Sequence, residues 1–393
     1  YKIKNFKLFS EIKINEFNVE NNYNLKKFFP EIGNDINFIN HKINLNVNKK
    51  KLVINGNGSV KLQKSNDKIE YIIKKEKEKF IFSSFLEIKD NDFLIDILNY
   101  KKKAKSKLKI NFDGIYILDE KVIFNSIILN ENKNRINLDT LIFDENFKIK
   151  DIKRIDLNYL DYENRKNELF ISKKKNDFVI IGSSFNANSL IENLLKNDDE
   201  KKLNIFKRNF NFDLEIDAVF LDKVYEVKNL KGNFLIEKND ILNAFLIASF
   251  PDDRVLKLTI DTNQEGKITT LFLDNAEPIV KRYKFIKGYE SGSLDFYSLK
   301  KEDKTMSTLK IYDFKLKELP VLTKLLTLAS LQGIADVLSG EGIRFNEFEM
   351  IFENQKKLMT IKELYAIGPA ISVLMDGYVE KDKVISLRGT LVP

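Results

Sequence analysis

Along most of this chain, every second residue is apolar and the residues between are polar or charged. The clearest run alternates Phe210, Phe212, Leu214 and Ile216 with Asn211, Asp213, Glu215 and Asp217. Successive side chains of a β-strand point to opposite sides, so this run predicts a half-exposed strand with one apolar and one acidic side. The same alternation recurs at 43–48, 107–112, 136–138 and 256–260. A mainly β fold with antiparallel strands is therefore expected.

Turn-forming residues separate these runs. The Asn-Gly-Asn-Gly segment at 55–58 and the Asp113-Gly114 pair have the composition of hairpin turns. If a strand and its turn take roughly 13 to 16 residues, the chain holds roughly 25 to 30 strands, whereas an open sheet tolerates about ten before it curls or splits. The apolar side of such a sheet has to be hidden by a second sheet, by closure into a barrel, or by curling into a trough filled by another molecule. Alternation alone does not distinguish these three arrangements.

Two segments have helical spacing of apolar residues. The shorter is Ser189–Leu195, with Asn188 as a cap, and the longer runs from Pro320 to Leu338, with Gly340 beyond its end. The longer helix is expected to pack on the β body, near one end of the sheet, through Leu322, Leu325, Leu326 and Ala329. A location at a membrane interface is the second interpretation. Because Lys324, Gln332 and Asp336 lie within it, a membrane span is the least favoured.

The residue types needed for most active sites are scarce. The chain has no Cys and one His, His41, which excludes disulfides, thiolate metal sites, a cysteine nucleophile and the usual zinc cluster. The Gly-Ser-Ser motif at 182–184 lacks the second Gly of a nucleophile elbow. The acidic runs at 198–200 and 252–253 are interpreted as solvated turns. We therefore expect no enzyme, no catalytic or metal site and no cofactor.

The positive charge of the chain does not indicate nucleic-acid binding. Lys and Arg total 66 against 58 Asp and Glu, but Arg is rare, as in sequences from AT-rich genomes. Lys clusters at 49–51, 101–103 and 173–175 occur at expected turns, without the interleaved aromatic residues of a single-strand platform. Lysines at turns and sheet edges also protect strands from aggregation. No nucleic-acid partner is expected.

Three segments near the C-terminus occur in an order that resembles a known family. They are LLTLASLQGIADVLSGEGIRF at 325–345, GPAISVLMDG at 368–377 and SLRGTLVP at 386–393. This order is similar to the C-terminal region of AsmA-like proteins, and most similar to their YhdP-type branch in Gram-negative bacteria. The resemblance covers 181–393, including the helix at 320–338. Residues 1–180 match by strand character alone and are expected to form the N-terminal part of the same β-groove.

The resemblance implies a long, curled antiparallel sheet whose apolar groove shields phospholipid acyl chains. It also implies a periplasmic location, with an anchor outside this segment in the inner membrane, and a bridge-like role in carrying phospholipid between inner and outer membranes. The expected groove-lining residues are Phe210, Phe212, Leu214, Ile216, Leu256, Leu258 and Ile260. The alternative is a structural or assembly protein of the envelope that acts through protein–protein contacts.

Overall fold

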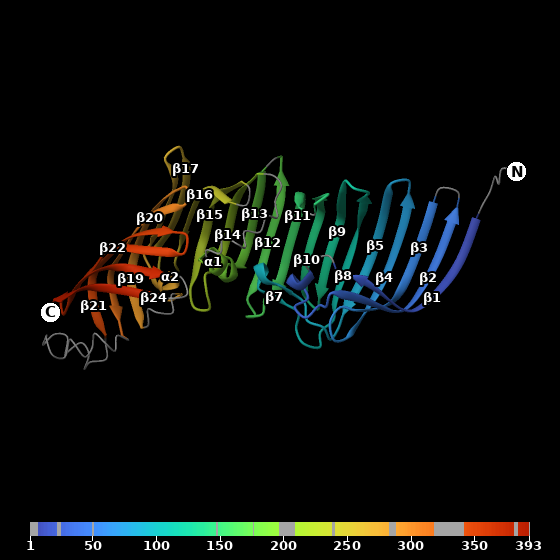
Figure 1. Ribbon diagram of the computed structural model, residues 1–393, viewed down its shortest axis with the longest axis horizontal. Helices are drawn as coiled ribbons and strands as arrows, with labels where there is room; N and C mark the ends of the chain where they lie inside the picture. The colour runs from blue at the N-terminus through green and yellow to red at the C-terminus, as the bar shows by residue number, and fades with distance from the viewer. Residues whose placement is uncertain are drawn as a thin grey trace. The chain divides into compact units, whose positions relative to one another are not determined.

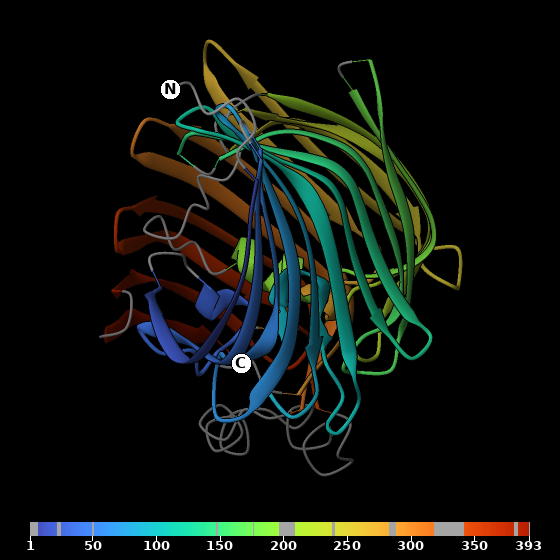
Figure 2. The same ribbon diagram turned by 90° about the vertical axis from the view of Figure 1, so that its right-hand side faces the viewer.

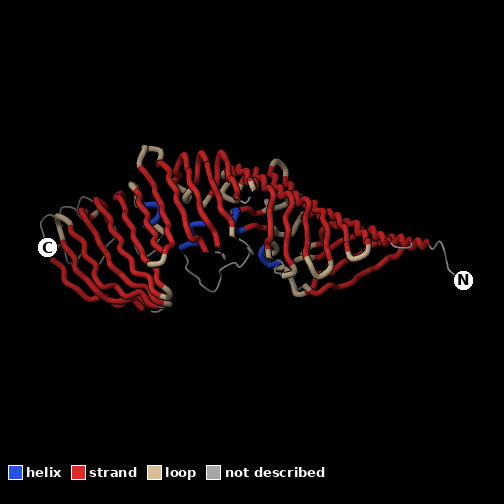
Figure 3. The backbone as a smooth tube through the Cα atoms, turned by 90° about the horizontal axis from the view of Figure 1, so that it is seen from above, coloured by secondary structure: helices blue, strands red, loops and turns tan. Residues whose placement is uncertain are grey.

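The chain divides into two compact units, Tyr1–Phe212 and Asp213–Pro393, called unit 1 and unit 2. The computed structural model describes residues 7–21, 25–48, 51–146, 148–175, 177–195, 209–237, 240–282, 288–317, 342–380 and 384–392. Strands make up most of each unit, with a few short helices (Figures 1 and 3). The expected boundary at 180/181 came from the extent of the family resemblance and stays a prediction.

Thirteen strands lie within unit 1. They are β1 (Lys7–Glu20), β2 (Asp35–Asn48), β3 (Lys51–Lys61), β4 (Asn66–Glu76), β5 (Lys79–Ile88), β6 (Leu94–Ile95), β7 (Tyr100–Lys101), β8 (Leu108–Ile117), β9 (Lys121–Glu131), β10 (Asn134–Asp144), β11 (Ile149–Leu160), β12 (Lys166–Lys174) and β13 (Asp177–Asn186). All except the two-residue pair β6–β7 belong to the main sheet.

The other strands continue in chain order. They are β14 (Phe210–Phe220), which contains the unit boundary, β15 (Glu226–Glu237), β16 (Asp240–Ser249), β17 (Val255–Asn263), β18 (Gly266–Leu273), β19 (Tyr289–Lys301), β20 (Lys304–Leu316), β21 (Ile343–Gln355), β22 (Leu358–Ile367), β23 (Ser372–Glu380) and β24 (Val384–Val392).

Neighbouring strands are antiparallel and follow one another along the chain. In unit 1 the main sheet runs from β1 to β5 and then from β8 to β13. In unit 2 each strand from β15 to β24 pairs with the next. The mainly β, antiparallel fold is confirmed. The described strands number 24, fewer than expected, because those of the main sheet are as long as 14 residues.

The sheet is curled, as expected. In Figure 2 the strands of unit 1 bend toward the side on which its helices lie. Irregular register is present in the strands of both units. Asn40 in β2 has φ 52° where the pairing with β3 shifts, and Asn229 in β15 has φ 53° where the pairing with β16 shifts. Such bulges insert a residue into one strand and increase its local bend and twist.

Four short helices are described. They are η1 (Leu25–Lys27), η2 (Asp96–Leu98), α1 (Asn188–Leu195) and α2 (Glu277–Val280). Helix α1 confirms the helix predicted at 189–195, and α2 was not predicted. The predicted helix at 320–338, with Leu322, Leu325, Leu326 and Ala329, lies outside the described residues.

Two predicted turns are wrong. Residues 55–58 lie inside β3, and Asp113-Gly114 lies inside β8 at a register irregularity. The glycines of β3 make room for rings from neighbouring strands. A Cβ on Gly56 would lie 2.1 Å from the ring of Tyr71, and one on Gly58 would lie 2.4 Å from the ring of His41. Glycine in a strand often marks such a close approach and not a turn.

Candidate functional site

One side of the sheet of unit 1 is apolar from strand to strand. Residues directly opposite one another point to the same side of a sheet. A first row of such residues crosses β5 to β12 and contains Leu86, Ile110, Leu129, Ile136, Leu157 and Leu169. A second row, two residues further along each strand, contains Phe112, Ile127, Leu138, Ile155, Ile171 and Ile180. We call this side the apolar face of unit 1.

The two rows differ in burial. Five of the six residues of the first row are buried, from 3% exposed at Ile136 to 8% at Ile110. All residues of the second row are half-buried. Within the described part of the chain, the protein therefore covers one row of the apolar face and leaves the next accessible.

Unit 2 repeats this arrangement. Its first row crosses β17 to β23 and contains Leu256, Leu273, Leu294, Ile311, Phe348, Ala366 and Val373. Its second row crosses β16 to β23 and contains Leu246, Leu258, Leu271, Phe296, Leu309, Met350, Leu364 and Met375. Five of the seven first-row residues are buried, from fully buried at Leu273 to 8% exposed at Val373, and Leu256 and Phe348 are half-buried. Every member of the second row is half-buried. These two rows define the apolar face of unit 2.

The opposite side of each sheet is dominated by charged pairs. In unit 1, Lys68 Nζ lies 2.6 Å from Glu70 Oε1. In unit 2, Lys310 Nζ lies 3.1 Å from Glu349 Oε2, and the Tyr365 hydroxyl donates to the same carboxylate at 2.6 Å. This hydrogen bond, followed by Lys310, holds the pKa of Glu349 below its usual value. Scattered apolar side chains such as Ile81, Phe245 and Leu374 are also exposed on this side.

Residues 89–106, the covering segment, contact the ends of the strands beside the buried row of unit 1, at Glu131 and Tyr159. The Tyr100 hydroxyl donates to Glu131 Oε2 at 2.8 Å, and the Tyr159 hydroxyl donates to the carbonyl of Leu98 at 2.7 Å. Burial is the main cause that raises the pKa of both tyrosines, so both hydroxyls stay protonated donors at neutral pH. Phe93, within the segment, is buried, and its ring lies 5.4 Å from that of Phe29. One edge of the apolar face is thereby closed.

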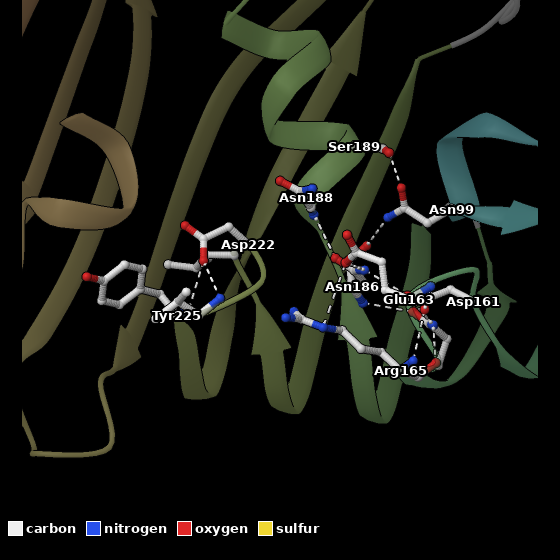
Figure 4. Close-up of polar contacts among 12 residues, drawn as sticks. Asn99, Asp161, Glu163, Arg165, Asn186, Asn188, Ser189, Asp222 and Tyr225 are labelled. Carbon is white, nitrogen blue, oxygen red and sulfur yellow. Dashed lines mark hydrogen bonds and ion pairs between the residues drawn. The ribbon is translucent and has the colours of Figure 1, made fainter. Parts of the chain in front are cut away.

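A buried polar network fixes α1 next to the covering segment (Figure 4). The Asp161 carboxylate accepts from the backbone amides of Glu163 and Arg165 at 2.9 Å each, and from Asn186 Nδ2 at 2.7 Å. Asn99 of the covering segment donates to the carbonyl of Asn186 at 3.3 Å. The side chains of Asp161 and Asn99 thus form hydrogen bonds that fix nearby backbone groups, which indicates that this network has a structural role.

Helix α2 is anchored in unit 2 through Glu277. Its carboxylate accepts from the backbone amide of Ser291 at 2.7 Å, from Lys281 Nζ at 2.5 Å and from the Tyr225 hydroxyl. Burial alone would raise the pKa of Glu277, but these hydrogen bonds outweigh it and hold the pKa below its usual value. The loop before this tyrosine is held by Asp222, which accepts from the Tyr225 amide at 2.8 Å (Figure 4).

The single histidine belongs to an aromatic cluster on the apolar face. His41 is 1% exposed, and its Nε2 lies 3.1 Å from the carbonyl of Ser59. Rings of Phe17, Phe38 and Tyr71 lie 5.4 to 5.9 Å from its ring centre. The Tyr71 hydroxyl lies 3.4 Å from His41 Nδ1, and in the described part of the chain no carboxylate forms a hydrogen bond or ion pair with the ring. Its surroundings indicate a packing role.

The predicted groove-lining residues lie on two elements. In β14, Phe210 and Ile216 are buried and Phe212 and Leu214 are half-buried, while Asp213, Glu215 and Asp217 are exposed. The rings of Phe210 and Phe212 lie 5.3 and 5.2 Å from that of Phe178. Leu256, Leu258 and Ile260 are half-buried, and the first two belong to the rows of unit 2. That these seven residues line a lipid-filled groove stays a prediction.

The other motifs considered for chemistry have ordinary structural surroundings. Ser183 and Ser184 lie in β13, where their hydroxyls donate to Glu168 at 3.2 Å and to the carbonyl of Lys166 at 2.8 Å. Asp252 forms an ion pair with Arg254 at 2.6 Å. The acidic run at 198–200 lies outside the described residues. Among described residues, no group of three or more His, Asp or Glu side chains is placed to hold a metal ion.

Comparisons with known proteins identify no relative. No family model, no curated protein and no solved structure matches the chain. The AsmA-like resemblance therefore stays a prediction from the sequence motifs. In the described ranges, no helix has the length and apolar character needed to cross a membrane.

Sequence reasoning missed the covering segment and the difference between buried and half-buried rows. The segment has no two-residue alternation over a useful length, although its aromatic residues Phe93 and Tyr100 are a signal of packing. The rows depend on the register, that is, on which residues of neighbouring strands lie opposite one another. Bulges change this register, and the alternation within a single strand does not reveal them.

Proposed function

We propose that this protein carries lipids, with acyl chains lying along the half-buried rows of its apolar faces. The observation that supports this most is the continuity of those rows: Phe112 to Ile180 in unit 1 and Leu246 to Met375 in unit 2 are apolar at every strand they cross. A sheet closed on its own side chains would bury both rows. Here one row is buried and its neighbour is accessible to a ligand.

The chemistry of the rows suits an acyl chain. Burial of apolar area yields about 25 cal/mol per Å², or about 0.8 kcal/mol per methylene, and it needs no directional partner. A uniform row of Leu, Ile, Phe and Met side chains therefore stabilises a chain at many positions along the sheet with similar energy. Such a surface favours carriage along the sheet over capture at one point.

The AsmA-like resemblance supports a cellular setting for this activity. On that basis the proposed role is bridge-like phospholipid transport in the envelope of a Gram-negative bacterium, between inner and outer membranes. The protein would work in the periplasm and be held to the inner membrane by an anchor outside this segment.

Matched substitutions on adjacent residues test the proposal. Leu271→Lys and Ile180→Lys place a charge on the half-buried rows, whereas Phe272→Lys and Ile181→Lys place it on the opposite side of the same two strands, where the parent side chains are 37% and 52% exposed. Native mass spectrometry would measure co-purifying lipid in each variant. We expect lipid to be lost from the Leu271→Lys, Ile180→Lys double variant and retained by the Phe272→Lys, Ile181→Lys double variant. Equal lipid occupancy in both would argue against the proposal, and so would its absence from the parent protein.

A second candidate, a structural or assembly protein, is favoured by β24. This strand pairs with β23, and its Val384, Ile385 and Leu387 are 49%, 63% and 44% exposed. Among the described strands only β23 pairs with β24, and an apolar strand with an unpaired side can accept a strand from a partner. If Ile385→Lys abolishes association with a partner protein while lipid occupancy is unchanged, the assembly function gains support.

A further inference from the structure

We propose that unit 2 holds the phosphate group of an anionic lipid at a polar patch within its apolar face. The hydroxyl–lysine patch consists of Lys267 and Thr269 in β18, Ser298 and Lys300 in β19, and Thr305 and Ser307 in β20. Cross-strand register places Lys267 opposite Lys300, Thr269 opposite Ser298, and Ser298 opposite Ser307. This inference rests on the proposed lipid-carrying function and specifies the ligand.

The serines of the patch are largely buried residues whose hydroxyl oxygens stay available to a ligand. Ser298 is 7% exposed and Ser307 is 3% exposed. Neither hydroxyl has a hydrogen-bond partner among the described residues. Neither Oγ atom is fully buried, so each hydroxyl is accessible and can exchange water for a ligand oxygen. Two such groups directly opposite each other on one face are suited to donate to the oxygens of a phosphate.

Lys300 is the lysine of the patch with positive charge to offer, because Lys267 already forms an ion pair. Like charges directly opposite each other on neighbouring strands destabilise a sheet. Lys267 Nζ lies 2.8 Å from Asp240 Oδ1. Glu237 of β15 is the residue opposite Asp240 in the sheet. For Lys300, no described carboxylate oxygen lies within 4.0 Å, although Glu302 and Asp303 follow it in the turn. An anion beside Lys300 would relieve its repulsion with Lys267.

The surroundings of the patch identify the ligand as an amphiphile. Two residues further along the same three strands stand Leu271, Phe296 and Leu309 of the half-buried row. At about 3.3 Å per residue along a strand, the polar and apolar groups are separated by about 7 Å. A phosphate at the hydroxyls and lysines would therefore place the first methylenes of an attached chain on these apolar side chains. The patch therefore suits a lipid whose phosphate group carries a net negative charge, which Lys300 can pair with.

Binding of three probes to the parent protein tests this assignment. Dodecyl phosphate and dodecylphosphocholine carry the same dodecyl chain and differ in the charge of the headgroup. Inorganic phosphate has no alkyl chain. Isothermal titration below the micellar concentrations would give each Kd. We expect dodecyl phosphate to bind about tenfold more tightly than dodecylphosphocholine, as one charge-assisted contact allows. Inorganic phosphate is expected to bind more weakly than either.

Variants then locate the site. Lys300→Gln should weaken dodecyl phosphate binding about tenfold and affect dodecylphosphocholine less, because the latter has no net charge. The Ser298→Ala, Ser307→Ala double variant should weaken the binding of both lipids, because both present phosphate oxygens to the hydroxyls. Lys257→Gln is the matched control, because Lys257 is an exposed lysine on the opposite side of β17. It should change neither affinity.

The outcomes separate this inference from the proposed function. Equal affinity for the two lipids, or no effect of both patch variants, would overturn the headgroup site and leave lipid carriage intact. Failure of both lipids to bind would overturn lipid carriage itself. Inorganic phosphate binding as tightly as dodecyl phosphate, with the same loss in Lys300→Gln, would show a site for free phosphate and contradict the lipid assignment.

Discussion

Replacing Gly58 with Ala should destabilise unit 1, because the added methyl group has no space. Its Cβ would lie 2.4 Å from Cδ2 and 2.7 Å from Cγ and Nε2 of His41. The His41 ring is 1% exposed and is held at Nε2 by the carbonyl of Ser59, so it has little freedom to move away. Overpacking of this kind costs about 1–3 kcal/mol. Removing a flexible glycine from a strand stabilises the fold by about 0.5–1 kcal/mol. The net loss expected is therefore about 1 kcal/mol, within a range of about 0–2.5 kcal/mol.

Two other glycines serve as comparisons. A Cβ on Gly56 would meet the Tyr71 ring at 2.1 Å, but Tyr71 is only half-buried and its ring can rotate, so Gly56→Ala should cost less. A Cβ on Gly33 has its nearest neighbours at 3.7 and 3.9 Å, so Gly33→Ala should be neutral or slightly stabilising.

Thermal unfolding followed by circular dichroism measures these differences. For a unit of this size, each kcal/mol lowers the Tm by about 2–4 °C. The His41→Ala, Gly58→Ala double variant supplies the decisive comparison, because without the ring the Gly58→Ala change should cost nothing further. A Gly58→Ala protein as stable as Gly33→Ala, or a Gly58→Ala cost that persists without the His41 ring, would refute the reasoning.

Three further predictions concern anchors and faces. Tyr159→Phe should destabilise unit 1 by about 1–2 kcal/mol in urea unfolding, since the buried carbonyl of Leu98 loses its donor; Tyr162→Phe, on a residue 55% exposed, should be neutral. Glu277→Gln should be less stable than the parent at pH 7. The folded pKa of Glu277 lies below its unfolded value of about 4.3, so its contribution to stability is present above that pH and is lost as the pH falls through the folded pKa. The stabilities of the two proteins should therefore converge in acid. A difference in stability that is constant with pH would contradict this prediction. Lys310→Gln, on the charged side, should change stability by less than about 1 kcal/mol and leave lipid occupancy unchanged.

The sequence predicted which side of a strand is apolar wherever alternation is strict. In β14, Asp213, Glu215 and Asp217 are exposed and the apolar residues between them are buried or half-buried, as expected. This works because the pleat of a strand sends successive side chains to opposite sides regardless of what lies nearby. Class of fold and antiparallel pairing follow from the same pattern repeated along the chain.

Features that depend on other strands were not predicted. The glycines at 56 and 58 have turn-like composition, but they lie in β3 because Tyr71 and His41 come from neighbouring strands and occupy the space above them. Likewise, Lys267 and Lys300 are 33 positions apart in number and become neighbours only through the register of β18 with β19. Which residues become neighbours depends on cross-strand register, and bulges and hairpin lengths set that register.

Photocrosslinking with a phospholipid that carries a diazirine on its acyl chain tests lipid carriage most directly. After irradiation, peptide mass spectrometry would map the adducts on the intact protein. Adducts are predicted on the half-buried rows, around Ile127, Leu138 and Ile155 in unit 1 and around Leu271, Phe296 and Leu309 in unit 2. Exposed apolar residues on the opposite side, such as Ile181, Phe272 and Leu374, should be unlabelled. Labelling of both sides in proportion to exposure, or no labelling of the rows, would contradict the account.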